Sequence, residues 1–154
     1  MTDTSALSDA DFSHVVRLAP LVSIDLVIKD PEQKALVGLR VNEPARSTYF
    51  VPGGVIRKNE TIKKAFARII KAELGFNHGF NEASFIGVFE HFYETNRFAH
   101  PDYGTHYVVL AYRLELPERP PIRLDAQHRA IRWMTPTEII SAPDVHPNTQ
   151  VYFS

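Results

Sequence analysis

Apolar residues at helical intervals predict a short helix near the start of the chain. The capping and acidic residues at 8, 9 and 11 suit a helix N-terminus, and Phe12, Val15 and Val16 then form one apolar face before Pro20. The sequence therefore predicts a first amphipathic helix that ends ahead of the proline.

A second, longer helix is predicted from about Thr61 to Leu74, with Gly75 as its stop. Glu73 falls on the same side of this helix as the apolar residues, although it is an acid. The apolar stripe consists of Ile62, Ala65, Phe66, Ile69, Ile70 and Leu74.

The remaining apolar runs are typical of strands, because they are rich in β-branched and aromatic residues. The first run contains Asp25, an acid at a position where a core residue or plain alternation is expected. A turn at 30–34 predicts that the first two runs pair as a hairpin. Strands are expected at 21–28, 35–41, 48–51, 85–93, 104–116 and 130–134.

This order of elements favours an α+β fold, in which a mixed sheet is sandwiched between helices. A further helix is expected from Thr135, which has capping character and is followed by Pro136. The polar and aromatic segment 94–103 is a candidate active-site loop. At 154 residues and 44% hydrophobic content, we expect one domain over residues 1–154.

Composition narrows the possible functions. A formal charge of -1, with 17 basic and 18 acidic residues interspersed, argues against a nucleic-acid surface or a basic membrane patch. Because the chain has no cysteine, thiolate nucleophiles and cysteine zinc sites are excluded. No stretch approaches ~20 consecutive apolar residues, and residues 1–10 lack the pattern of a secretory signal. We therefore expect a cytoplasmic protein that binds neither nucleic acid nor membrane.

The segment Pro52-Gly53-Gly54 is the strongest chemical signal. A turn of this composition lets backbone carbonyls face outward without Cβ obstruction. Glu73, near the end of the following helix, can share one hard, oxygen-ligated cation with them. Phosphate chemistry is the natural expectation.

The same region resembles the Nudix box, through the spacing Gly54-x5-Glu60-x7-Arg68 followed by Glu73-x-Gly75. Two acidic positions of that box are lost, since Ile69 and Ala72 stand where the family has glutamates. In Nudix folds a pair such as Glu60 and Arg68 braces the box, and we favour that structural role for it here.

The loss of both acids resembles the modified box of GDP-mannose mannosyl hydrolases, a Nudix subfamily. The resemblance covers roughly positions 11–153. It implies a Nudix fold and water attack on the anomeric carbon of GDP-mannose, or a related GDP-hexose such as GDP-glucose, giving GDP and inverted free sugar. The segments that carry the resemblance are residues 20–25, 38–40, 49–54, 91–93, 105–110, 127–128 and 132–133.

The resemblance also implies a Mg²⁺ site, for which Mn²⁺ is an alternative. Its protein ligands would be the Gly53 carbonyl, the Glu73 carboxylate and the Gln127 side-chain oxygen. The cation would neutralise the diphosphate and make GDP a better leaving group.

His128 would then be the general base, because an imidazole titrates near neutrality. Arg40 would meet the charge on the diphosphate. Two roles are open for Asp25, which could accept hydrogen bonds from sugar hydroxyls or help to hold Arg40. An ion pair near the end of the sheet is the simpler interpretation.

Four more side chains are candidate substrate contacts. Tyr107 and His91 resemble phosphate and sugar contacts of the subfamily, although aromatic residues in strands are often core. Phe12 resembles a residue that packs on guanine, with a core role equally open. Val55 replaces an arginine of the subfamily, and Arg57 is the candidate substitute.

Two other functions stay open. The chain could be a conventional Nudix pyrophosphatase acting on a nucleoside diphosphate derivative, which the missing acids disfavour. It could also be a silent module that binds a nucleotide sugar. In each case the partner is a small molecule, and the resemblance implies a homodimer.

Overall fold

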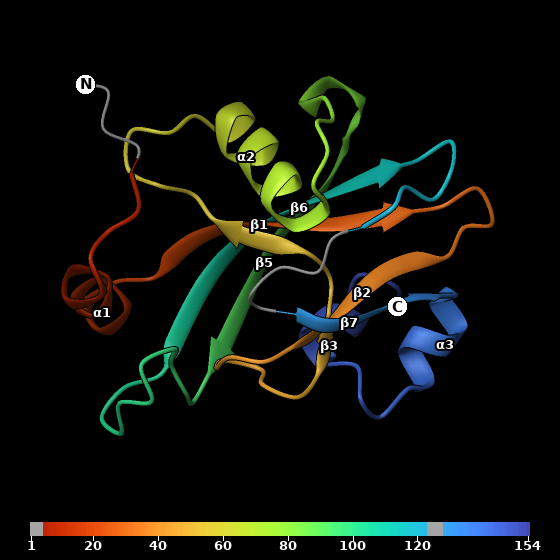
Figure 1. Ribbon diagram of the computed structural model, residues 1–154. Coiled ribbons are helices and arrows are strands. Elements are labelled where there is room, and N and C mark those ends of the chain that lie inside the picture. The colour runs from red at the N-terminus through yellow and green to blue at the C-terminus, as the bar shows by residue number, and fades with distance from the viewer. Residues whose placement is uncertain (1–4, 123–127) are drawn as a thin grey trace.

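The computed structural model describes residues 5–122 and 128–154, and these form a mixed sheet with helices on both faces (Figure 1). The strands are β1 (Leu21–Lys29), β2 (Ala35–Arg40), β3 (Tyr49–Phe50), β4 (Gly53–Val55), β5 (Ser84–Tyr93), β6 (Thr105–Glu115) and β7 (His128–Met134). The helices are α1 (Asp9–Leu18), α2 (Ile62–Leu74), α3 (Pro136–Ser141) and α4 (Pro147–Gln150), with a 3-10 turn η1 at Phe80–Glu82.

The sheet has the order β3-β2-β1-β6-β5, while β4 pairs with β1 and β7 pairs with β2. Only the β1–β6 pairing is parallel among the described strands, and the others are antiparallel. The predicted pairing of the first two strands is confirmed by the register Lys29↔Ala35. β1 lies inside the sheet, which explains why its residues are almost continuously buried.

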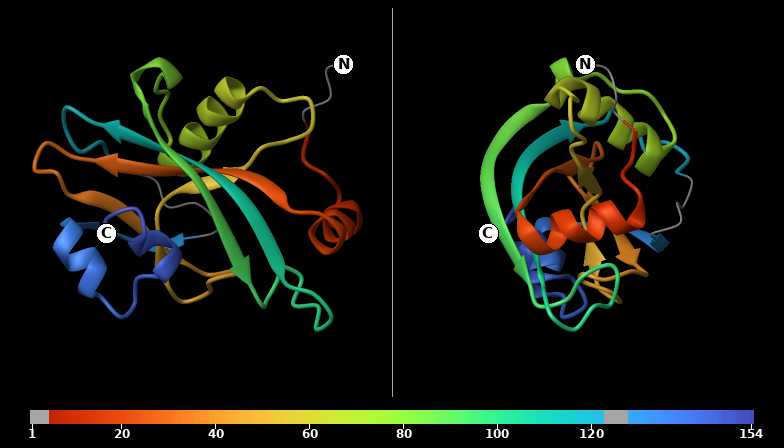
Figure 2. Two further views of the ribbon diagram at one scale, coloured as in Figure 1. Left: turned by 180° about the vertical axis from the view of Figure 1, so that it is seen from behind. Right: turned by 90° about the vertical axis from the view of Figure 1, so that its left-hand side faces the viewer.

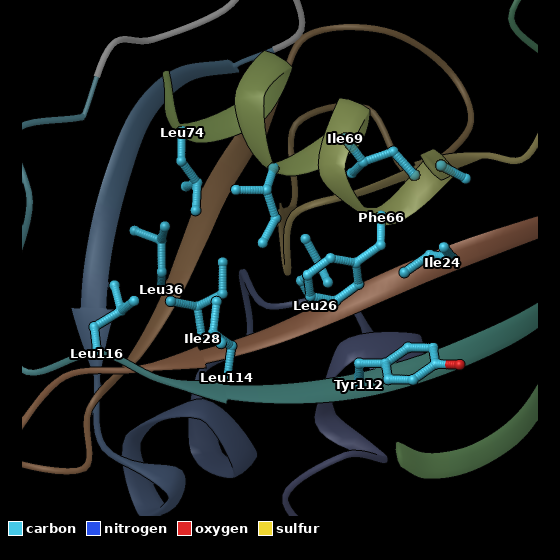
Figure 3. Close-up of a cluster of buried hydrophobic side chains, with 12 residues drawn as sticks. Ile24, Leu26, Ile28, Leu36, Phe66, Ile69, Leu74, Tyr112, Leu114 and Leu116 are labelled. Carbon is cyan, nitrogen blue, oxygen red and sulfur yellow. The ribbon is translucent and has the colours of Figure 1, made fainter. Parts of the chain in front are cut away.

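Two apolar layers cover the two faces of the sheet. Leu36 of β2 packs in the cluster beneath α2, where Ile24, Phe66 and Tyr112 also lie (Figure 3). Its neighbours along β2 pack in a second cluster with Ile139 of α3, because successive strand residues point to opposite faces. This arrangement confirms the predicted α+β sandwich.

The central helix α2 has defined ends and a buried stripe. The Thr61 side chain caps it by accepting from the Lys64 amide at 3.2 Å, and Gly75 ends it in the left-handed region at φ 77°. Phe66 is completely buried between α2 and the sheet. Truncating such a residue to alanine typically costs ~3–5 kcal/mol, so this stripe is a main contribution to stability.

Three details differ from the sequence predictions. Gly53 lies in strand β4 rather than in a turn, because it pairs with Asp25 of β1 across a long sequence separation. β7 begins at His128, two residues before the predicted start. α4 and η1 were not predicted, since they are too short to show helical periodicity.

Figure 2 shows α1 lying across one end of the curved sheet, at the end where the β5–β6 loop projects. None of the described helices is both long enough and apolar enough to cross a membrane.

Candidate active site

A pocket of about 140 Å³ lies where β1, β2, β4, β5 and β6 come together. It brings together six of the residues singled out from the sequence, which come from distant parts of the chain. These are Phe12, Asp25, Arg40, Gly53, His91 and Tyr107. Their individual roles stay predictions, but their shared location is now a structural fact.

Asp25 is a buried carboxyl group that lines this pocket. It is 7% exposed, and its Oδ2 accepts a hydrogen bond from the Tyr152 hydroxyl at 2.5 Å. Burial raises the pKa of Asp25 to about 7, against the opposing effects of the Tyr152 hydrogen bond and the Arg40 charge. Asp25 therefore changes its charge near neutral pH.

Alternation along β1 explains how an acid is accommodated in a core strand. Ile24 and Leu26 point into the cluster beneath α2, so the intervening residue Asp25 points to the opposite face, into the pocket. Its Oδ1 lies over Gly53, where an added Cβ would come within 2.5 Å of that oxygen. Glycine is therefore required at this position by the close approach of the carboxylate.

His91 is a second buried polar group and contacts the same tyrosine. It is 3% exposed, and its Nε2 lies 3.4 Å from the Tyr152 hydroxyl. Burial, with a smaller effect of His146, lowers the pKa of His91 to about 4. His91 is consequently neutral around pH 7 and serves as a hydrogen-bonding group.

Arg40 lies at the end of β2 and is half-buried. Its Nε donates to the Pro44 carbonyl at 3.0 Å, which fixes one edge of the guanidinium. The β2–β7 register pairs Arg40 with His128, so the backbone of the predicted base runs beside the pocket arginine. Gln127 and the side chain of His128 lie outside the described residues.

Tyr107 and Phe12 line other walls of the pocket. Burial raises the pKa of the Tyr107 phenol, so its hydroxyl stays protonated and can donate a hydrogen bond. The Phe12 ring meets Phe98 edge-on, with centroids 5.8 Å apart. Val55 lines the pocket as well, whereas Arg57 is not among the described residues that do.

The predicted brace between Glu60 and Arg68 is confirmed. Arg68 donates to both Glu60 oxygens, at 2.7 and 2.9 Å, and to the Val55 carbonyl at 2.7 Å. Glu60 also accepts from the Arg57 amide at 3.0 Å. Arg68 and the amide lower the pKa of Glu60. These bonds let the carboxylate hold the segment after β4, and Glu60 is not among the described residues that line the pocket.

The backbone geometry of β4 suits a cation ligand at Gly53. Leu26 donates to the Pro52 carbonyl and Ile56 donates to the Val22 carbonyl, both at 2.8 Å. These bonds make positions 52 and 56 part of the β1–β4 ladder. The alternation of an antiparallel ladder then turns the Gly53 carbonyl away from β1.

The helix above β4 offers one acid rather than an acidic cluster. Ile69 is 2% exposed and packs so closely on Gly54 that an added Cβ would lie 3.0 Å from its Cγ1. Glu73 follows one turn later on the same side and is half-buried, while Ala72 is exposed. Across the described residues, no three His, Asp or Glu side chains are grouped to hold a metal. The donors present suit a single hard cation that also takes oxygens from a ligand.

Two residues near the C-terminus contact the side chains that line the pocket and were not predicted. Tyr152 joins Asp25 and His91 through its hydroxyl. His146 packs between Phe50 and Tyr93, with ring centroids 5.4 and 5.3 Å away. The local sequence gives no periodic signal for this segment, because its place is set by docking against the sheet.

Known proteins resemble the chain over most of its length. The family model described as NUDIX domain matches residues 19–153. The low-salt glycan biosynthesis protein Agl8 of Haloferax volcanii is 38% identical over 133 residues, which cover 86% of this chain and 82% of that protein.

Solved structures show the same fold at low sequence identity. A MutT NUDIX hydrolase from Burkholderia pseudomallei superposes with a TM-score of 0.69 at 21% identity, covering 87% of this chain and 95% of that one. The MutT protein of Methanosarcina mazei gives a TM-score of 0.67 at 14% identity, covering 87% and 91%. With the sandwich fold, the Glu60–Arg68 brace and the matching family model, these findings show that the chain belongs to the Nudix hydrolase family.

Proposed function

We propose that this protein hydrolyses a GDP-hexose, such as GDP-mannose, to GDP and free sugar by water attack at the anomeric carbon. The observation that carries the proposal is the apolar contact of Ile69 with Gly54, at the helix position where the usual Nudix box has an acid. A pyrophosphatase that activates water at phosphorus with several cations needs carboxylates there. The similarity to Agl8, whose name refers to glycan biosynthesis, also favours a sugar-containing substrate.

Polar groups in the pocket suit a sugar diphosphate. The guanidinium of Arg40 can pair with phosphate oxygens. Because Tyr152 occupies Oδ2 of Asp25, Oδ1 is the oxygen left to accept from a sugar hydroxyl. The protonated Tyr107 hydroxyl can donate to a phosphate or sugar oxygen, and the neutral His91 adds a further polar group.

We assign the general base to His128. Burial lowers the pKa of His91 to about 4, and burial and Arg40 lower the pKa of His146. Neither is therefore well matched to proton abstraction near pH 7. The resemblance to the mannosyl hydrolases implies His128 instead, and its backbone lies opposite Arg40.

Nudix hydrolases generally use divalent metals, and we propose Mg²⁺ here, held by the Gly53 carbonyl, Glu73 and Gln127. When bound, it would neutralise charge on the diphosphate leaving group. The protein oxygens are few, so the substrate phosphates would complete the coordination shell.

The direct test is to incubate the protein with GDP-mannose and Mg²⁺ and to resolve the products by anion-exchange chromatography. GDP plus mannose is the expected result. GMP plus mannose 1-phosphate would replace this proposal with a conventional pyrophosphatase, and binding without turnover would replace it with a nucleotide-sugar-binding module.

The base assignment has its own test. His128→Gln should lower kcat at neutral pH by ~10² to 10⁴ while leaving the affinity for GDP nearly unchanged. The exposed residue His14 in α1 supplies a matched control, His14→Gln, which should keep full activity. An unchanged rate in the His128 variant would remove its assignment.

A further inference from the structure

Arg97, in the loop between β5 and β6, is a second guanidinium on the pocket wall. Among the described residues, Arg40 and Arg97 are the basic side chains that line the pocket. The Nε of Arg40 donates a hydrogen bond to the Pro44 carbonyl. Arg97 is exposed, and its side chain has no hydrogen bond or ion pair with the described part of the chain, so its paired N–H groups are available to a ligand.

The neighbouring residue Asn96 fixes the loop around Arg97. Asn96 is completely buried, and its Nδ2 donates to the carbonyls of His100 and Tyr103 at 2.8 and 2.7 Å. Its Oδ1 accepts from the amides of Phe98 and His100 at 3.0 and 3.2 Å. One side chain thus satisfies four backbone groups, so the backbone that carries Arg97 has a defined course.

Contacts outside the loop fasten it to the pocket rim. On one side of Arg97, the Thr95 hydroxyl donates to Glu43 at 2.9 Å, and Glu43 is itself a pocket residue. On the other side, Phe98 packs edge-on against Phe12 of α1. Arg97 is therefore presented from a segment held at both flanks, and little ordering of the backbone is needed when a ligand binds.

The charge of Arg97 already acts on the pocket. Burial raises the pKa of Tyr107, and the positive charges of Arg40 and Arg97 both oppose that shift. The two arginines thus influence the same hydroxyl from β2 and from the β5–β6 loop. Among the described residues, neither arginine forms an ion pair with Asp25 or Glu43, the two acids that line the pocket, although the Arg40 charge acts on Asp25.

We propose that Arg97 is a substrate-binding residue that donates paired hydrogen bonds to the diphosphate of the nucleotide substrate, together with Arg40. A planar guanidinium matches the geometry of phosphate oxygens better than any other side chain. The inference deepens the proposed function and rests on it for the nucleotide, but it requires only that the ligand carries a diphosphate.

The test measures binding, so that it does not depend on turnover. Arg97→Met removes the charge and keeps a side chain of similar length, and Arg113→Met is the matched control at an exposed position of β6 outside the pocket lining. Titration calorimetry with Mg²⁺ would compare GDP, inorganic pyrophosphate and guanosine. The Arg97 variant should bind GDP and pyrophosphate ~10-fold or more weakly, with guanosine unchanged, and the control should match the wild type.

Unchanged affinity for GDP and pyrophosphate in Arg97→Met would overturn the inference. An equal loss of guanosine affinity would also overturn it, because the loop would then act through the nucleoside and not the diphosphate. If the wild type failed to cleave GDP-mannose while the variant still lost pyrophosphate affinity, the proposed function would fail and the role of Arg97 would stand.

Discussion

Replacing Tyr152 with phenylalanine removes one hydroxyl group and leaves Asp25 without its hydrogen-bond donor. The aromatic ring, which packs edge-on against Phe89 at 4.8 Å between centroids, is kept. Since Asp25 is only 7% exposed, water cannot readily replace the lost hydroxyl. The variant should therefore be less stable, by an amount that depends on the charge of Asp25.

The magnitude follows from the pKa of Asp25, which burial raises to about 7. At pH 8 the Asp25 carboxylate is ionised, so Tyr152→Phe removes a charge-assisted hydrogen bond worth ~1.5–3 kcal/mol. At pH 5 the carboxyl group is protonated, so the same substitution removes a neutral hydrogen bond worth ~0.5–1.5 kcal/mol. The folded pKa lies above the ordinary value of 3.8. The folded protein therefore binds more protons than the unfolded chain in this window, and Asp25 makes stability fall as pH rises. Loss of the hydroxyl raises the pKa further and steepens that fall.

Urea denaturation at pH 5 and pH 8, with EDTA present so that no cation adds its charge, measures the effect. Tyr152→Phe should destabilise the protein by roughly 1 kcal/mol more at pH 8 than at pH 5. His91, with its pKa of about 4, is mainly neutral at both pH values. Tyr103→Phe is the control, because that hydroxyl bonds to the neutral Ser13. Equal losses at the two pH values would refute the reasoning.

Three further predictions concern β4 and α2. Arg68→Met should lower the free energy of unfolding by ~2–3 kcal/mol in urea denaturation, because it leaves Glu60, whose side chain is 4% exposed, without its partner. A loss below ~0.5 kcal/mol would contradict the brace. Gly53→Ala should cost ~1–3 kcal/mol in thermal melts, since its Cβ would meet backbone and side-chain oxygens at 2.6 and 2.5 Å; Gly79→Ala, with its nearest atom at 3.4 Å, should melt like the wild type. Glu73→Gln should sharply reduce Mg²⁺-dependent turnover, and an unchanged Mg²⁺ titration would remove Glu73 from the site.

The sequence was informative where a local pattern is clear and where a single residue interrupts it. Asp25 interrupts an apolar strand, and the structure places it in the pocket. The stripe of α2 and its stop at Gly75 follow from helical spacing and from the left-handed backbone that glycine adopts without strain. These features depend on neighbours in the chain, so they can be read without the fold.

Features that depend on long-range docking could not be predicted. Gly53 looks like part of a turn, yet pairing with β1 makes it a strand residue. Tyr152 has no periodic context, and its contact with Asp25 joins residues 127 positions apart. Arg97 lies in a loop that was singled out for its polar and aromatic composition, but only the lining of the pocket shows that Arg97 is the loop residue that faces the site.

The central claim is that water attacks carbon and not phosphorus. Hydrolysis of GDP-mannose in ¹⁸O-enriched water, followed by mass spectrometry of both products, tests it directly. Attack at the anomeric carbon predicts ¹⁸O in the released mannose and none in GDP. Label in the phosphate of GDP, or in any phosphorylated product, would contradict the proposed reaction.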